Sequence, residues 1–206
     1  MVPEKPKTMS DARTHILAEI RRNKPAPTPL PDLPHYAHNP EELESRFCVT
    51  LNLIGADFIR MEALGDPLTW LQERYGEHAR MAVCDPDFGS GNVDVQKDTP
   101  LETLNLLDVA VIPGRFGVAE NGAVWIEESW LPRRVLPYIA QHLVLTISAQ
   151  DIVGDLHAAY RRIGQIQGGF GAFIAGPSKT ADIEQALVKG AQGPRTAIVV
   201  LKGATG

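Results

Sequence analysis

The sequence predicts an α/β fold, in which helices flank an open, largely parallel β-sheet. Two observations support this prediction. Short apolar runs rich in β-branched residues alternate along the chain with stretches of helical apolar spacing, and such alternation is typical of a parallel sheet with helices on both faces. The run from Leu107 to Ile112 is nearly all apolar and is followed by Pro113 and Gly114, which indicates a strand buried on both faces.

Residues 1–39 are predicted to be an appendage of one main domain, since 206 residues suffice for a single substantial core. Residues 10–23 have the apolar spacing of a helix, with Ser10 or Asp11 as its N-cap. Six prolines lie in the segment from Pro25 to Pro40, both ends included. Because proline fixes φ and lacks a backbone donor, this segment is predicted to be an extended arm without regular secondary structure.

The α/β domain is predicted to span residues 40–206. Its first helix begins at Pro40, a residue favoured at the first helical position, and ends near Gly55. The segment 85–100 is turn-rich and acidic and is predicted to be a surface loop. The predicted strands are 58–61, 79–84, 107–112, 118–127, 143–147, 170–175 and 197–201, and the further helices are 67–75, 149–163 and one after Thr180.

Polar residues beside the central apolar runs are the first candidates for a functional site. Gly114 and Arg115 follow the predicted strand 107–112, and Glu120, Asn121 and Gly122 interrupt the next apolar run, 118–127. Ligands bind α/β sheets at strand ends, so a carboxylate here could attack an activated acyl group or act as a general base. The competing interpretation is a β-hairpin, because Asn-Gly between apolar residues favours a tight turn, and Glu120 would then only face solvent.

A second group of candidates lies near the C-terminus. The order Gly176, Pro177, Ser178, Lys179, Thr180 does not match a phosphate-binding P-loop, because two residues separate the glycine from the lysine. The pattern favours a strand that ends at Gly176, a tight turn, and a helix capped by Thr180. A helix N-terminus attracts anions, but two acidic residues in its first turns already satisfy the helix dipole, so capping is favoured over anion binding.

Composition excludes several functions. The net charge of −5 argues against nucleic-acid binding. No apolar stretch is long enough to span a membrane and the N-terminus lacks the apolar core of a signal peptide, so a cytoplasmic protein is expected. Cys48 and Cys84 are predicted to be buried free thiols. Two cysteines cannot hold a Cys₄ iron–sulfur cluster, and no metal site or other cofactor is predicted in this chain.

The segment GPSKTADIEQALVKGAQGPR, from Gly176 to Arg195, closely resembles the C-terminal signature of the LUD-domain family, in particular its lactate-utilisation protein C branch. Upstream, Ala119-Glu120-Asn121-Gly122 fits the A-E-x-G pattern of that family, which commonly has threonine where this chain has Asn121. The resemblance implies a fold like that of the NagB, RpiA and CoA-transferase group. It also implies a role in the oxidation of L-lactate to pyruvate beside partner proteins that carry the iron–sulfur clusters.

A second resemblance supplies an alternative. The same four letters, Ala-Glu-Asn-Gly, occur around the nucleophilic glutamate of family I CoA-transferases, which implies Glu120 as the nucleophile and Gly122 as the residue that permits close approach of the acyl group. A third hypothesis is a small anionic, phosphorylated ligand held by Arg115 and Lys179. The sequence is also compatible with a homo-oligomer.

Overall fold

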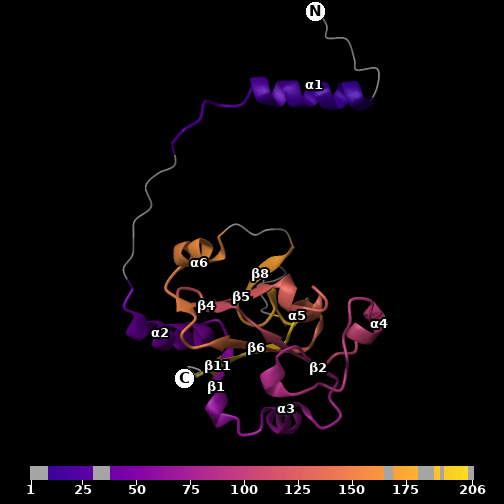
Figure 1. Cartoon of the computed structure of the whole chain (residues 1–206), viewed down its shortest axis with the longest axis vertical. Coiled ribbons are helices and arrows are strands. Elements are labelled where there is room, and N and C mark those ends of the chain that lie inside the picture. Colours follow the sequence, from indigo (N-terminus) through magenta and orange to yellow (C-terminus); the bar gives the residue numbers. More distant parts are fainter. Residues whose placement is uncertain (1–8, 30–37, 165–168, 181–187, 191–192, 204–206) are drawn as a thin grey trace, which may run out of the picture. The chain divides into compact units, whose positions relative to one another are not determined.

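The computed structural model describes residues 9–29, 38–164, 169–180, 188–190 and 193–203 (Figure 1). The chain divides into two compact units, Met1–Ala37 and His38–Gly206. In the first unit, helix α1 (Met9–Arg22) confirms the helix predicted over residues 10–23. Residues 24–29 have no regular secondary structure, and the rest of the predicted proline-rich segment up to Ala37 lies outside the described residues.

The second unit is built on a five-stranded parallel sheet with the strand order β1-β11-β6-β3-β2, which confirms the predicted fold class. Its strands are β1 (Asp57–Arg60), β2 (Met81–Val83), β3 (Val109–Pro113), β6 (His142–Ser148) and β11 (Thr196–Lys202). Central strand β6 pairs with β3 on one side and β11 on the other, so that Leu143 lies opposite both Ala110 and Ala197. All five strands were predicted, to within a few residues at their ends.

Several helices of this unit begin where the sequence supplies a side-chain cap. The side chains of Asn39 and Asp66 accept hydrogen bonds from the backbone nitrogens of Glu41 at 3.1 Å and Thr69 at 2.8 Å, and a proline follows each cap. The α-helices are α2 (Pro40–Leu53), α3 (Pro67–Tyr75), α4 (Leu101–Leu104), α5 (Leu136–Ile139) and α6 (Leu156–Ile163), and the 3₁₀ helices are η1 (Met61–Ala63), η2 (Pro86–Phe88) and η3 (Glu128–Trp130).

A second sheet, with the strand order β7-β4-β5-β8, departs from the sequence prediction. Strands β4 and β5 pair antiparallel, as do β5 and β8, whereas β4 and β7 are parallel. The apolar segments predicted at 118–127 and 170–175 therefore leave the parallel sheet and form a layer of their own. These strands are β4 (Phe116–Val118), β5 (Ala123–Glu127), β7 (Ile152–Val153) and β8 (Gly171–Ile174).

Two further predictions differ from the structure. The helix predicted over 149–163 begins only at Leu156, because Ile152 and Val153 form an edge strand and Asp155 caps the helix that follows. Strands β9 (Lys179–Thr180) and β10 (Val188–Lys189) pair antiparallel, so Thr180 belongs to a strand. The helix predicted after Thr180 falls on residues 181–187, which lie outside the described residues.

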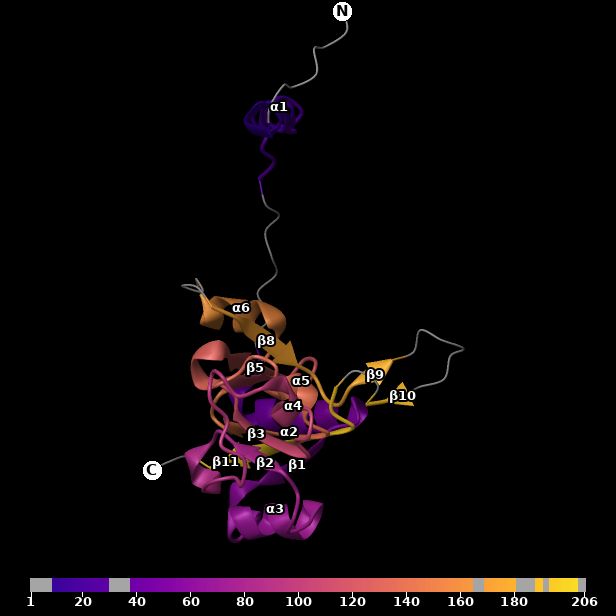
Figure 2. The ribbon, with the colours of Figure 1, turned by 90° about the vertical axis from the view of Figure 1, so that its right-hand side faces the viewer.

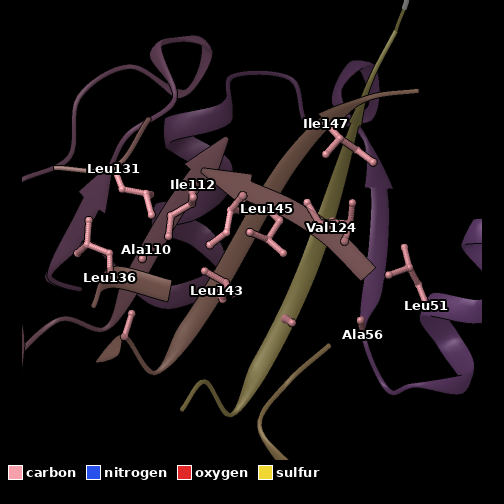
Figure 3. Close-up of a cluster of buried hydrophobic side chains, with 14 of the residues drawn as sticks. Leu51, Ala56, Ala110, Ile112, Val124, Leu131, Leu136, Leu143, Leu145 and Ile147 are labelled. Atoms are coloured by element: carbon pink, nitrogen blue, oxygen red, sulfur yellow. The ribbon is translucent and has the colours of Figure 1, made fainter. Parts of the chain in front are cut away.

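The layers follow from the alternation of side chains along the strands of the parallel sheet. Val109 and Val111 point to one face, where they pack with α3 and Phe88, and Ala110 and Ile112 point to the other, where they pack with α2, α5 and the second sheet. Figure 3 shows Leu145 and Ile147 of β6 with Val124 of β5 in this inner cluster. Helix α6 covers the outer face of the second sheet, so the order of layers is α3, parallel sheet, second sheet, α6 (Figure 2).

Candidate functional site

The residues Glu120, Asn121 and Gly122 lie in the loop of a β-hairpin. Strands β4 and β5 pair Val118 with Ala123, so the loop has four residues rather than the two of a tight turn. Gly122 donates its N–H to the Val118 carbonyl at 2.9 Å and has φ +69°, a conformation that favours glycine. The Asn121 side chain accepts the Ala123 N–H at 3.0 Å. The β-hairpin itself is confirmed, although its loop is longer than the tight turn that was predicted, and Asn121 stabilises this loop.

The exposed carboxylate of Glu120 contacts the start of helix α6. Its Oε2 atom accepts a hydrogen bond from the backbone nitrogen of Leu156, the first residue of α6, at 2.9 Å. The cap residue Asp155 accepts the N–H of Ala158 at 2.6 Å. Two carboxylates thus satisfy donors that a helix leaves unpaired at its N-terminus. In this geometry Glu120 holds the hairpin loop to α6.

The two sequence segments that contain most of the candidates meet at the C-terminal end of α2. A Cβ atom added at Gly122 would lie 2.8 Å from Cδ1 of Ile54, and one added at Gly176 would lie 3.1 Å from the Ile54 carbonyl oxygen. The Lys179 ammonium group donates to the same carbonyl. Thr50, one turn earlier, donates to the Ala119 carbonyl at 2.9 Å. This motif junction, formed around Ile54, brings together segments that are more than 50 residues apart in the sequence.

The other predicted residues of the C-terminal segment have backbone roles. Ser178 is half-buried, and its N–H donates to the Pro194 carbonyl at 2.8 Å. Lys179 and Thr180 form strand β9. Lys179 is therefore engaged at the motif junction, whereas Arg115 lies elsewhere, and no contact among the described residues joins the two in the shared ligand site that was hypothesised.

Arg115 lies in the wall of an open cleft of about 1000 Å³. Its Nη1 atom pairs at 2.5 Å with Oε1 of Glu127, which also accepts the indole N–H of Trp125 at 3.0 Å. Burial opposes ionisation of Glu127, but the hydrogen bonds from Trp125 and Arg115 outweigh it and lower the pKa of this carboxyl. The preceding residue, Gly114, lies between the two sheets. It is not one of the described residues that line the cleft.

Three further cations line this cleft, and none of them was predicted as a site residue. Arg133 donates from Nη1 to the carbonyls of Lys97 at 2.7 Å and Thr99 at 2.8 Å, which anchors the Lys97 loop beside it. Arg134 pairs with Glu128, and the hydrogen bond from Arg134 lowers the pKa of that carboxyl. We call this site the basic cleft; its cations are Lys97, Arg115, Arg133 and Arg134, its anions are Glu127 and Glu128, and its apolar wall includes Trp125, Leu131, Val135, Ile163 and Phe170.

A buried polar network at the carboxyl edge of the parallel sheet contradicts the prediction that 85–100 is wholly a surface loop. Asp85 lies two residues after the end of β2 and is 1% exposed. It accepts hydrogen bonds from the Thr146 hydroxyl and from the Lys202 ammonium group, the latter at 2.9 Å, and Lys202 also contacts Asp87 at 2.5 Å. Burial opposes the charge of Lys202, but the two carboxylates raise its pKa overall. The signal for this network was the position of Asp85 at a strand end.

Both cysteines are free thiols, as predicted, but each is half-buried rather than buried. Burial, with a smaller effect of the neighbouring Asp85, raises the pKa of Cys84 to about 11, and burial also raises the pKa of Cys48. Both thiols are therefore protonated at neutral pH and weakly nucleophilic. Within the described ranges, no three His, Cys, Asp or Glu side chains converge as metal ligands would, and no helix is long and apolar enough to cross a bilayer.

Comparison with known proteins gives a consistent family and fold. The family model described as LUD domain matches residues 7–201. A crystal structure of a DUF162 family protein from Deinococcus radiodurans superimposes with a TM-score of 0.62 over 81% of this chain and 100% of that one, at 16% sequence identity. At this identity the structural likeness supports the fold alone.

Two curated relatives match parts of the chain. Lactate utilization protein C from Shouchella clausii is 29% identical over 106 residues, which cover 49% of this chain and 46% of the relative. An uncharacterized protein from Neisseria meningitidis serogroup B is 25% identical over 134 residues, which cover 63% of this chain and 58% of the relative. The chain thus spans about half the length of the curated relatives it matches.

Proposed function

Since this chain belongs to the LUD domain family, we propose that it is a subunit of a lactate-utilisation system and supports the oxidation of L-lactate to pyruvate together with iron–sulfur partner proteins. The observation that carries this proposal is the sequence similarity to lactate utilization protein C. The C-terminal signature from Gly176 to Arg195, quoted above, supports the same assignment.

The chemistry of the reaction and the composition of the chain indicate which protein transfers the electrons. Oxidation of lactate to pyruvate removes two electrons and two protons, and the electrons need an acceptor. A Cys₄ cluster needs four thiolates, whereas this chain has two cysteines, both held as thiols by burial. We therefore assign electron transfer to the iron–sulfur partners and a binding or assembly role to this chain.

Reconstitution tests this proposal directly. Lactate-dependent reduction of an artificial electron acceptor is measured with the purified iron–sulfur partners, with and without this chain. We expect the chain to raise the rate and to co-elute with a partner in gel filtration. An unchanged rate together with no co-elution would overturn the proposal.

The alternative function is acyl transfer with Glu120 as the nucleophile. One observation favours it: Glu120 is exposed, and within the described structure its Oε1 atom has no hydrogen-bond partner, so one carboxylate oxygen is accessible to a substrate. Against it, the other oxygen is bonded to the backbone of α6, which gives this carboxylate a structural role without any catalysis.

Replacement of Glu120 by glutamine separates the two functions. Glutamine keeps an oxygen that can accept the Leu156 N–H, but it cannot form an acyl anhydride or thioester. If the chain is an assembly subunit, the Glu120→Gln variant raises the rate of lactate oxidation as the wild type does. Its free energy of unfolding is lower than that of the wild type by less than about 1 kcal/mol. Transfer between acetyl-CoA and a free carboxylic acid that is present in the wild type and absent in Glu120→Gln would establish the alternative.

A further inference from the structure

We propose that the basic cleft binds an organic dianion that carries a planar ring. This proposal is independent of the lactate-utilisation role, because L-lactate and pyruvate are small monoanions without a ring. It rests on three features of the cleft: an excess of two positive charges, guanidinium groups with free donors, and an apolar wall beside them.

The charge balance of the cleft differs from that of the whole chain. The chain has a net charge of −5, yet the residues that line the cleft include four cations and two anions. Glu127 and Glu128 each pair with one arginine, Arg115 and Arg134. Both carboxyls have lowered pKa values and stay ionised at neutral pH. The cleft therefore has an excess of two positive charges, and Arg133 and Lys97 are the cations outside these two ion pairs.

Those two cations lie side by side. Arg133 binds only backbone carbonyls among the described residues, and one of them is the carbonyl of Lys97. The Lys97 side chain is exposed, and its charge acts on Glu128, which already pairs with Arg134. An anion with two negative charges would neutralise this pair, and a monoanion would leave one charge unbalanced.

The arginines that are already paired retain donors toward the cleft. Arg115 reaches Glu127 through Nη1 alone, and Arg134 reaches Glu128 through Nε alone. Because a guanidinium has five N–H donors in a planar fork, each group keeps donors that match a carboxylate or phosphate. The two side chains are 40% and 61% exposed, so these donors are accessible.

The apolar wall indicates the chemistry of the uncharged part of the ligand. Phe170 lies under the Arg134 guanidinium, 6.0 Å from its ring centroid to the guanidinium carbon. The Trp125 indole is held in place by Glu127, and glycine at position 171 lets the backbone approach that ring, because a Cβ there would overlap it. A volume of about 1000 Å³ exceeds the need of a three-carbon acid. Trp125 is only 5% exposed, so the accessible part of this wall is formed by half-buried residues such as Phe170 and Ile163, and a planar ring attached to the anionic head would pack against them.

Isothermal titration calorimetry on the full chain tests the proposal with five probes. Phenyl phosphate and phthalate are ring-bearing dianions with different heads, benzoate is a ring-bearing monoanion, and inorganic phosphate and L-lactate lack a ring. We expect phenyl phosphate or phthalate to bind at least about tenfold more tightly than the other three probes, which corresponds to about 1.4 kcal/mol. Preference for one of the two identifies the head group as phosphate or dicarboxylate.

Matched variants locate the binding. Lys97→Gln removes one charge from the cleft, and Lys24→Gln removes the same charge from an exposed segment of the other unit. We expect Lys97→Gln to raise the Kd of the ring-bearing dianion about threefold to fivefold, as for a partly exposed charge pair, and Lys24→Gln to leave it unchanged. Equal effects of the two variants on the Kd would overturn the proposal. So would the absence of binding of both ring-bearing dianions at concentrations up to about 10 mM, the weak end of specific binding.

Discussion

At the scale of single residues, the N-terminus of α6 collects the polar contacts of two distant segments. Glu120 of the hairpin loop accepts the N–H of Leu156. Asp155 accepts the N–H of Ala158 and also bonds to Nε2 of His38 at 2.8 Å, and His38 in turn contacts Arg46 at 3.1 Å. His38, the first residue of the α/β unit, is therefore bound to the N-terminus of α6 through the carboxylate of Asp155.

Replacement of Asp155 by asparagine is predicted to weaken the fold in a pH-dependent way. Asparagine caps a helix about as well as aspartate, so the variant loses mainly the charge. The backbone hydrogen bond from Ala158, and then the contact with His38, lower the pKa of Asp155 below its ordinary value of 3.8. A lowered carboxyl pKa adds stability above the ordinary value, and this stability is lost as the pH falls through the folded pKa.

Urea unfolding of wild type and Asp155→Asn measures this effect. We expect the variant to be less stable by about 1 kcal/mol at neutral pH, as for a charge at a helix N-terminus, with the difference shrinking below pH 3.8. A difference that stays the same down to pH 3, about one unit below that value, would show that the charge of Asp155 does not contribute.

The residues of the candidate site were predictable where local sequence identifies them. Arg115 and Glu120 stand out because they interrupt apolar runs, and the structure places the first in a cleft and the second on a helix end. Arg133 and Lys97 do not stand out, because they come from separate loops and only the fold brings them together. Asp85 was missed because its turn-rich surroundings indicated a surface loop, although it lies at a strand end.

At the scale of elements, the spacing between the two sheets depends on small residues where the chain passes from β3 to β4. A Cβ atom at Gly114 would overlap Val124 of the second sheet and lie 2.9 Å from Cγ2 of Ile147 in the parallel sheet. One at Gly117 would lie 2.9 Å from Phe47 of α2. These close approaches leave no room for a side chain in this part of the interface.

Gly114→Ala is predicted to lower the free energy of unfolding by about 1–3 kcal/mol, the usual range for added volume in a packed core. Chemical denaturation of the variant and wild type measures the change. Gly65→Ala is the control, because a Cβ there meets no atom within 4 Å and the cost comes only from its φ of +70°, about 1 kcal/mol. An equal loss in both variants would mean that the packing at Gly114 tolerates a methyl group.

Element types were predictable where their signals are local, and sheet membership was not. Helix α3 was predicted with its observed ends, because Pro67 marks its first turn and Gly76 its stop, and the structure adds Asp66 as its cap. The second sheet was missed because an apolar strand segment has the same pattern whether its neighbours are parallel or antiparallel. Strand β7 was merged into a helix because two residues are too short to show a period.

At the scale of the whole molecule, the packed core belongs to the second unit. Every residue of the three core clusters in the described chain, and every partly buried residue against them, lies between Leu43 and Leu201. Helix α1, in contrast, leaves Ile16 and Ile20 55% and 59% exposed. The second unit is therefore stabilised by a packed apolar core, whereas α1 leaves these two apolar side chains exposed.

Removal of residues 1–37 is predicted to leave the stability of the second unit unchanged within about 0.5 kcal/mol, as for changes away from a core. Thermal and urea unfolding of the shortened and full chains measure this. We expect co-elution with iron–sulfur partners to be the property that changes, since the family match begins at residue 7 and includes α1. A large loss of stability would show that the first unit contributes to the core.

The position of β11 also bears on how the protein is made. This strand is the last of the parallel sheet along the chain, yet it lies between β1 and β6 and pairs with both. A ribosome releases the N-terminal strands first, so β1 and β6 have unpaired edges and exposed apolar faces until residues 196–202 emerge. Chaperones that shield apolar segments on the nascent chain should therefore remain bound until synthesis has passed β11.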